Sequence, residues 1–288
     1  MALQSSGTIR ITEIRSELGS NSYSLTCLSG LAGKAAPHAM SEFYGYSAIP
    51  APNYKFGSPQ LLFDFSVTSA YSNSGTSIRD LSGNGNNGTF STGTGNGTAA
   101  TVTGYSSSGY LSLPGNSNQY SVRLPDSLKP SGNNAFSMVV HMKPKGYSYN
   151  GNYPGIISHG DNTLGLSWYL NGDANVQGAW RDLNSGDNGY SSLAYSGGAG
   201  LNVWSTWFLT SSGYNQTVYQ YYNGTRYAGP TTATSRAITV QSGWGFFLGL
   251  RYNQWINADI SYAAVYGSEL SAANVSTIGA ALSSRAPS

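Results

Sequence analysis

The acidic residues of this chain are few and widely spaced, which limits the acid–base chemistry they can perform. Retaining glycoside hydrolysis needs two carboxylates about 5 Å apart, which one strand face supplies at close sequence spacing. No glutamate occurs between Glu42 and Glu269, and no two aspartates in that region are separated by two or four positions. Asp182 and Asp187 straddle a glycine-bearing turn and are interpreted as loop residues. We therefore predict that the chain is not an enzyme.

The sequence also contains no pattern that indicates nucleophilic catalysis or phosphate binding. The histidines are His38, His141 and His159, and serine is so abundant that a Ser–His pairing carries no information. Strand alternation places His141 on an outward face, where a surface role is expected. The sequence Gly83-Asn-Gly85 precedes no helix, so a phosphate loop is rejected. Cys27, the single cysteine, is predicted to be a small buried apolar residue and not a reactive thiol.

Aromatic residues accumulate in a polar, loop-rich stretch between residues 147 and 195. Sugars are recognised by aromatic faces flanked by neutral amide and hydroxyl groups, which is the composition found here. The candidate glycan-binding residues are Tyr147, Tyr149, Tyr153, Trp180 and Tyr190. Tyrosine with serine, glycine and asparagine also suits protein-binding loops. A third interpretation is structural, because tyrosine and tryptophan are favoured in strands.

The composition is that of a β protein. Charged residues make up 9% of the 288, against about 25% in an average soluble domain. Glycine fills 37 positions and tyrosine 22, whereas exposed helix faces use Lys, Glu, Ala and Leu. The net charge of +2 is spread over isolated residues and gives no support for nucleic-acid binding. No apolar run approaches the ~20 residues of a membrane span, so no membrane insertion is expected.

Short runs with strand character recur beyond residue 60. Phe136, Met138, Val140 and Met142 alternate along one run and define an inward face. Asn223-Gly224 lies between two tyrosine-containing runs and predicts a type I′ hairpin. Ser271 is expected to cap a closing helix over residues 272–282. The other predicted strands are residues 110–113, 120–124, 155–158, 164–170, 203–210, 218–222 and 245–250. So many short strands predict an antiparallel two-sheet sandwich.

The first 46 residues have a different character. Residues 9–11 alternate like a short strand, and Thr12 with Glu13 resembles the start of a helix. A second such start occurs at residues 40–43, after a Gly/Ala/Pro loop. This small α/β module has too few apolar residues to be stable alone. Residues 47–59 contain three prolines and are predicted to be a linker, followed by the sandwich over 60–288.

The large region resembles the laminin-G-like branch of the concanavalin-A-like lectin/glucanase superfamily. The motifs that carry the resemblance occur in the family's order at residues 80–89, 110–126, 136–144, 204–209 and 258–271. The resemblance implies a jelly-roll sandwich. It also implies a calcium site, with the candidate ligands Asp64, Asp80, Asn84, Asn86 and Asp259. Ser261 replaces a customary aspartate, however, and the alternative is that Asp80 and the asparagines hold their turn by hydrogen bonds.

The small region resembles the short modules that open many bacteriophage tail-fibre and virion appendage proteins. The matching segments are residues 9–19, 28–33 and 39–45. The resemblance implies a virion structural protein that binds other virion proteins through residues 1–46. A tail fibre or tail-tip adhesin whose sandwich contacts host surface glycans is one interpretation. The other is a capsid decoration or head-fibre protein, with the sandwich as an exposed structural cap.

Location and assembly follow from the same resemblance. No secretory signal is visible at the start, so synthesis in the host cytoplasm and display on the virion, at the tail or the capsid surface, are expected. A homo-oligomer is expected as well. A trimer would suit a fibre, although no heptad or collagen repeat supports one.

Overall fold

The chain folds as two compact units, Met1–Lys55 and Phe56–Ser288, in a computed structural model. The boundary between them falls within the predicted linker. The structure describes residues 8–18, 22–31, 39–43, 56–67, 70–71, 75–92, 98–99, 105–106, 109–115, 120–146, 154–160, 164–170, 175–182, 187–194, 200–229, 231–233, 238, 240, 243–251 and 254–284.

The first unit is helical in its described part. Its elements are α1 (Ile11–Leu18), α2 (Leu25–Leu31) and the 3₁₀ turn η1 (Met40–Phe43). The side chains buried at its centre are Ile9, Ile14, Leu28 and Phe43. The helical turn predicted at residues 40–43 is confirmed, and the small size of this core agrees with the apolar content of the sequence.

Four expectations for this unit are wrong. Residues 9–11 form no strand, because the carbonyl of Arg10 already accepts the first helical hydrogen bonds, from Glu13 N and Ile14 N. Arg10 N in turn donates to Glu13 Oε2 at 2.9 Å, so the helix begins before Thr12. The predicted loop contains α2, and Cys27 on this helix is exposed, because Leu28 and Ser29 occupy the buried face.

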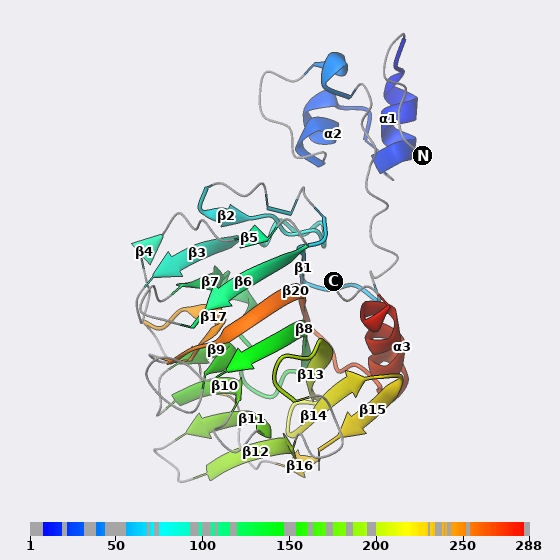
Figure 1. Cartoon of the computed structure of the whole chain (residues 1–288). Helices are drawn as coiled ribbons and strands as arrows, with labels where there is room; N and C mark the ends of the chain where they lie inside the picture. The colour runs from blue at the N-terminus through cyan, green and yellow to red at the C-terminus, as the bar shows by residue number, and fades with distance from the viewer. Residues whose placement is uncertain are drawn as a thin grey trace. The chain divides into compact units, whose positions relative to one another are not determined.

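The second unit is a sandwich of two antiparallel sheets that lie face to face (Figure 1). Sheet A has the strand order β15-β14-β13-β8-β20-β6-β5, with β1 beside β20 and β16 beside β14. Its strands are β15 (Thr225–Ala228), β14 (Asn215–Tyr222), β13 (Ser205–Ser211), β8 (Phe136–Gly146), β20 (Asn257–Tyr266), β6 (Tyr110–Pro114), β5 (Tyr105–Ser106), β1 (Leu61–Asp64) and β16 (Thr232–Ala233).

Sheet B has the order β12-β11-β10-β9-β17-β7-β3-β2, with β4 beside β3. Its strands are β12 (Asp187–Ala194), β11 (Asn175–Asp182), β10 (Leu164–Leu170), β9 (Gly155–Gly160), β17 (Phe246–Leu248), β7 (Tyr120–Leu124), β3 (Gly88–Thr92), β2 (Ser77–Ile78) and β4 (Thr98–Ala99). A separate hairpin joins β18 (Leu250–Arg251) to β19 (Gln254–Trp255), and a 3₁₀ turn, η2 (Asp126–Leu128), follows β7. The predicted jelly-roll sandwich is confirmed.

The core lies between the sheets, as the alternation of β8 predicts. Met138, Val140 and Met142 all belong to it, together with Trp207 from β13 and Trp168 from β10. Every strand run predicted for this unit overlaps a strand, although residues 245–250 divide between β17 and β18. The predicted hairpin turn is confirmed too, since Asn223 and Gly224 have φ angles of 47° and 78° between the paired residues Tyr222 and Thr225.

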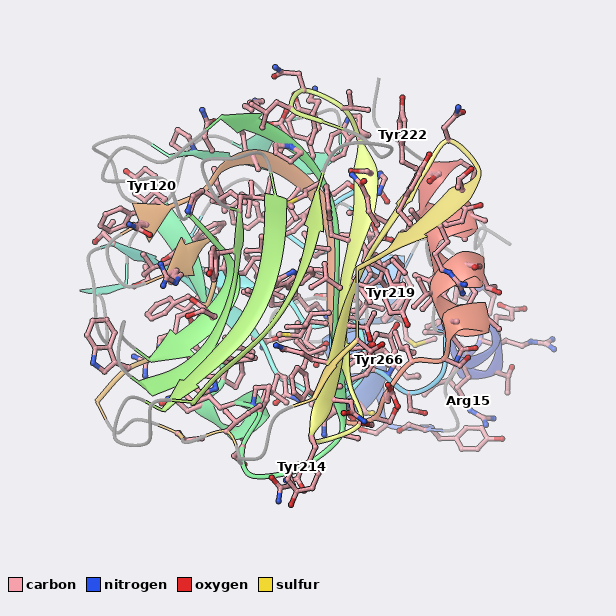
Figure 2. All side chains as sticks on the ribbon, turned by 90° about the horizontal axis from the view of Figure 1, so that it is seen from below. Arg15, Tyr120, Tyr214, Tyr219, Tyr222 and Tyr266 are labelled. Atoms are coloured by element: carbon pink, nitrogen blue, oxygen red, sulfur yellow. The ribbon has the colours of Figure 1, made fainter. Side chains whose placement is uncertain are left out.

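The closing helix α3 (Ala272–Ser283) begins where the sequence predicts, because Ser271 Oγ accepts a hydrogen bond from Asn274 N at 3.2 Å. Its buried side chains, Val275, Ile278 and Leu282, follow one helical face. The helix packs on β13, β14 and β15, on the side of sheet A that faces away from the core (Figure 2). It therefore covers part of a sheet face that would otherwise be open to solvent.

Candidate functional site

The predicted aromatic site is only partly within the described residues. Tyr147, Tyr149 and Tyr153 lie outside them. Trp180 lies on β11 opposite Gly189, and Tyr190 lies on β12 opposite Ala179. Both were expected in loops, and this was wrong: backbone pairing makes their segment a hairpin at the edge of sheet B. The two residues stand one register step apart, and successive strand positions belong to opposite faces of a sheet.

The asparagine-rich turn is held by Asp80. Its Oδ1 accepts hydrogen bonds from Leu62 N and Ser82 N, and its Oδ2 accepts them from Asn86 N and Ser82 Oγ, all at 2.7–2.9 Å. Asn84 and Asn86 donate from Nδ2 to the carbonyl of Gln60 at 3.2 and 2.7 Å. Both oxygens of the carboxylate are thus occupied by donors of the turn, as the hydrogen-bonding alternative requires.

The other two candidate ligands lie elsewhere. Asp64 Oδ1 accepts hydrogen bonds from Ser66 N and Oγ, and Asp259 forms ion pairs with Lys143 and Lys145. Among the described residues, no three His, Cys, Asp or Glu side chains stand close enough to hold a metal. Because calcium prefers six to eight oxygens, several of them anionic, these residues do not fit the ion. Calcium binding by this chain stays an untested prediction.

His141 is buried, contrary to expectation. Alternation places it correctly on the outer face of sheet A, but its side chain is only 1% exposed. Its Nδ1 lies 2.9 Å from Thr206 Oγ1, and its ring stacks on the indole of Trp204 with centroids 5.3 Å apart and planes 13° apart. Tyr110 meets the same indole edge-on at 5.7 Å. Sequence alternation predicts a face, but the aromatic rings that cover this face come from other strands.

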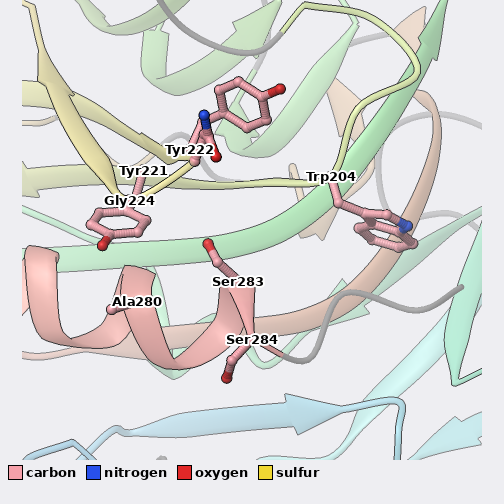
Figure 3. A pocket seen from close by; sticks show the side chains of 8 residues that line it. Trp204, Tyr221, Tyr222, Gly224, Ala280, Ser283 and Ser284 are labelled. Atoms are coloured by element: carbon pink, nitrogen blue, oxygen red, sulfur yellow. The ribbon is translucent and has the colours of Figure 1, made fainter.

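A groove of about 430 Å³ runs from Trp204 to the end of α3 (Figure 3). Such a volume lies within the range of ligand pockets, roughly 300–1,000 Å³. It is lined by Trp204, Tyr221, Tyr222, Asn223, Gly224, Ala280, Ser283 and Ser284. The I′ turn and α3 supply the neutral polar groups, while the start of β13 and the end of β14 supply the aromatic rings. None of the lining residues is charged.

Sequence reasoning did not assign this groove, although one signal pointed to it. Trp204 and Trp207 are three positions apart, so they occupy opposite faces of an extended segment. Trp207 is fully buried in the core, and Trp204 is half-buried on the outer face. A tryptophan on each face indicates that the outer face of the sheet also makes apolar contacts. The sequence does not indicate that α3 completes the site, because α3 begins more than sixty residues after Trp204.

Comparisons with known proteins agree on the fold. No protein-family model and no curated protein sequence matches the chain. Domain 4 of AbnA, a GH43 extracellular arabinanase from Geobacillus stearothermophilus solved with arabinotriose, has a TM-score of 0.57 and 16% identity over 77% of this chain and 98% of that domain.

Two clostridial toxin domains are also similar. The binding domain of Paraclostridial Mosquitocidal Protein 1 has a TM-score of 0.50 and 19% identity over 72% of this chain and 52% of that one. The ligand-binding domain of botulinum neurotoxin serotype D, solved with N-acetylneuraminic acid, has a TM-score of 0.50 and 17% identity over 77% and 50%. This chain spans about half the length of these toxin domains. At such identities the likeness shows the fold, a β-sandwich. Within the described residues, no helix is long and apolar enough to cross a membrane.

Proposed function

We propose that the chain is a glycan-binding structural protein of a bacteriophage virion, a tail fibre or tail-tip adhesin whose sandwich contacts host surface glycans. The proposal that the chain binds glycans depends on the groove between Trp204 and the end of α3. Its tyrosines supply ring surface, and Asn223, Ser283 and Ser284 supply neutral donors and acceptors for sugar hydroxyls.

The structural neighbours support glycan binding by a sandwich of this fold. One is an arabinanase domain solved with arabinotriose, and another is a toxin domain solved with N-acetylneuraminic acid. The virion part is supported by the sequence of residues 7–46, which resembles the attachment modules of phage appendage proteins. A first unit whose described residues form a core of four buried apolar side chains suits a segment that becomes stable on a larger assembly.

Binding of the full chain to a printed glycan array tests the groove. We expect Trp204→Ala to lose most of the signal, and Tyr222→Ala to weaken it without exposing His141. Tyr214→Ala is the matched control, because Tyr214 is an exposed tyrosine at a turn outside the groove, 47% accessible. Circular dichroism verifies that each variant is folded. Equal binding by all three variants would remove the groove from the proposal.

The predicted hairpin site is tested in the same experiment. Trp180→Ala and Tyr190→Ala are prepared separately, because the two residues occupy positions on opposite faces of β11 and β12. A loss in one variant alone identifies the face that binds. Unchanged binding in both discards this hairpin as a glycan site.

The virion location requires a separate measurement. Gold-labelled antibody against the sandwich, applied to intact particles, should decorate the tail. Labelling of the capsid instead would favour the decoration or head-fibre alternative. The absence of label from purified particles would reject both.

A further inference from the structure

The outer face of sheet A carries a row of polar residues beside Trp204. Ser112, Asp259 and Lys143 are direct cross-strand neighbours on β6, β20 and β8. Lys145 lies two positions beyond Lys143 and therefore on the same face. Trp204 immediately precedes β13, whose first residue pairs with Met142. The row thus ends at the indole that also lines the groove.

The contacts within this row are close. Lys143 Nζ lies 3.4 Å from Asp259 Oδ2, and Lys145 Nζ lies 2.5 Å from Asp259 Oδ1 and 3.5 Å from Ser112 Oγ. Lys143 Nζ is also 5.4 Å from the ring centre of Trp204 and 5.8 Å from that of Tyr110. Two ammonium groups therefore contact one buried carboxylate, and one of them also lies beside two aromatic rings.

The charges in this cluster do not balance. Asp259 is 1% exposed and is the one carboxylate in ion-pair contact with either lysine among the described residues. Two ammonium groups and one carboxylate leave one positive charge in excess. The lysine side chains are 28% and 35% exposed, so this excess faces solvent. Each ammonium has three donors, of which Asp259 and Ser112 engage only some.

Asp259 also holds the two lysines in place. A free lysine loses side-chain entropy when it binds a ligand, which weakens binding by about 0.5–1.5 kcal/mol for each immobilised chain. The ion pairs fix both ammonium groups at Asp259, and that of Lys143 beside the rings, before any ligand arrives. The groove lining itself contains no charged residue, and Lys143 places a positive charge beside the Trp204 end of the groove.

We propose that the site at Trp204 selects glycans that carry an anionic group, with the sugar ring in the groove and its anion on Lys143 and Lys145. This inference rests on the proposed glycan function and names the class of sugar. A carboxylate and a sulfate share the required chemistry, since either accepts charge-assisted hydrogen bonds from ammonium groups. A nucleic acid would need a longer track of cations than two lysines provide.

The test compares acidic glycans with their neutral parents, on an array that includes carboxylated and sulfated members. Tetragalacturonate and its methyl ester form the matched pair for calorimetry, because esterification removes the charge of each carboxyl group and adds one methyl group to it. We expect the acidic member of a pair to bind roughly tenfold more tightly. One hydrogen bond to a charged group changes the affinity by about this factor. Added salt should reduce this preference. A preference for carboxylated over sulfated members, or the reverse, identifies the anion.

Substitutions assign the preference to the cluster. Lys143→Met and Lys145→Met should each reduce the ratio of acidic to neutral binding. Arg123→Met, on β7 of sheet B, removes the same charge elsewhere and should leave the ratio unchanged. If neutral parents bind as well as the acidic glycans, the inference fails and the proposed function stands. If no glycan binds at all, the proposed function fails with it.

Discussion

His159 shows at the scale of one residue how burial links this fold to pH. The side chain is 1% exposed, and its Nε2 lies 3.1 Å from the carbonyl of Pro130. Burial, and secondarily the charge of Lys129, lower the pKa of His159 from 6.5 to about 4, although Pro130 and Asp126 oppose the shift. The native state therefore requires the neutral imidazole.

The direction of the pH effect follows from this shift. Between pH 6.5 and 4 the unfolded chain binds a proton at this position and the folded chain does not, so stability falls as the pH falls. The loss from this residue is about 1.4 kcal/mol per pH unit within that window, and on the order of 3 kcal/mol in total. Urea unfolding at pH 7, 5.5 and 4.5 measures it. His159→Gln removes the titration, so its stability should change less with pH. If the stability of the unchanged protein and that of His159→Gln fell equally with pH, His159 would not be the residue responsible.

Single residues also show where sequence reasoning stops. The face of His141 followed from strand alternation, whereas its burial depends on Trp204 and Tyr110, which reach it from β13 and β6. Cys27 was misplaced for a similar reason. Its apolar neighbours suggested burial, but Leu28 and Ser29 form the buried face of α2, and a turn of about 100° per residue places Cys27 outside that face.

At the scale of elements, the turn held by Asp80 is the part most dependent on one side chain. Asp80→Ala removes four hydrogen bonds: three hold residues 80–86 together, and the one from Leu62 N fastens the turn to β1. We expect a loss of about 2–4 kcal/mol, because buried donors are left without a partner. Asp126→Ala is the control, since that carboxylate is half-exposed and its ion pairs should contribute under about 1 kcal/mol.

Thermal unfolding with calcium or a chelator completes this test. The donors of the turn already occupy both oxygens of Asp80, so neither addition should shift the melting temperature. A calcium-dependent rise that Asp80→Ala abolishes would show that the turn rearranges to bind the ion.

The contact between α3 and β14 offers a second test at this scale. A methyl group added at Gly279 would fall inside contact distance of the Cβ and Cγ atoms of Tyr221, a residue of the groove. Gly279→Ala should therefore destabilise the sandwich by about 1–3 kcal/mol despite the helix preference of alanine. It should also weaken glycan binding, because Tyr221 must move. Thr277→Ala, on the exposed side of α3, should change stability by under about 0.5 kcal/mol. A stabilised Gly279→Ala variant would show that the helix is free to shift.

The strands themselves were predictable to unequal degrees. Runs such as residues 136–142 have one buried face and therefore alternate, which makes them visible in the sequence. Strands β11 and β12 are rich in glycine, asparagine and serine and lack that alternation, so backbone pairing defines them without an apolar signature. The groove was beyond prediction because it needs α3 to pack on β14, a contact that no local pattern encodes.

At the scale of the whole molecule, the two units differ greatly in the apolar surface that they bury. The sandwich has a continuous core between its sheets, and the first unit buries Ile9, Ile14, Leu28 and Phe43. The two cores share no residue. The order of the sequence motifs predicted the sandwich correctly, even though the solved structures that share this fold are under 20% identical to the chain.

Separate cores predict separate stabilities. A fragment of residues 56–288 should melt within about 2 °C of the same transition in the full chain, since its core is complete. A fragment of residues 1–55 should show little helix by circular dichroism, because a unit of this size with so small a core lacks the burial needed to offset chain entropy.

Ile14→Ala in the full chain should destabilise the first unit by about 2–5 kcal/mol, measured as faster proteolysis of that unit, without lowering the melting temperature of the sandwich. If the short fragment is instead well folded and monomeric, the first unit needs no partner, and its proposed role as the virion attachment module loses its physical basis.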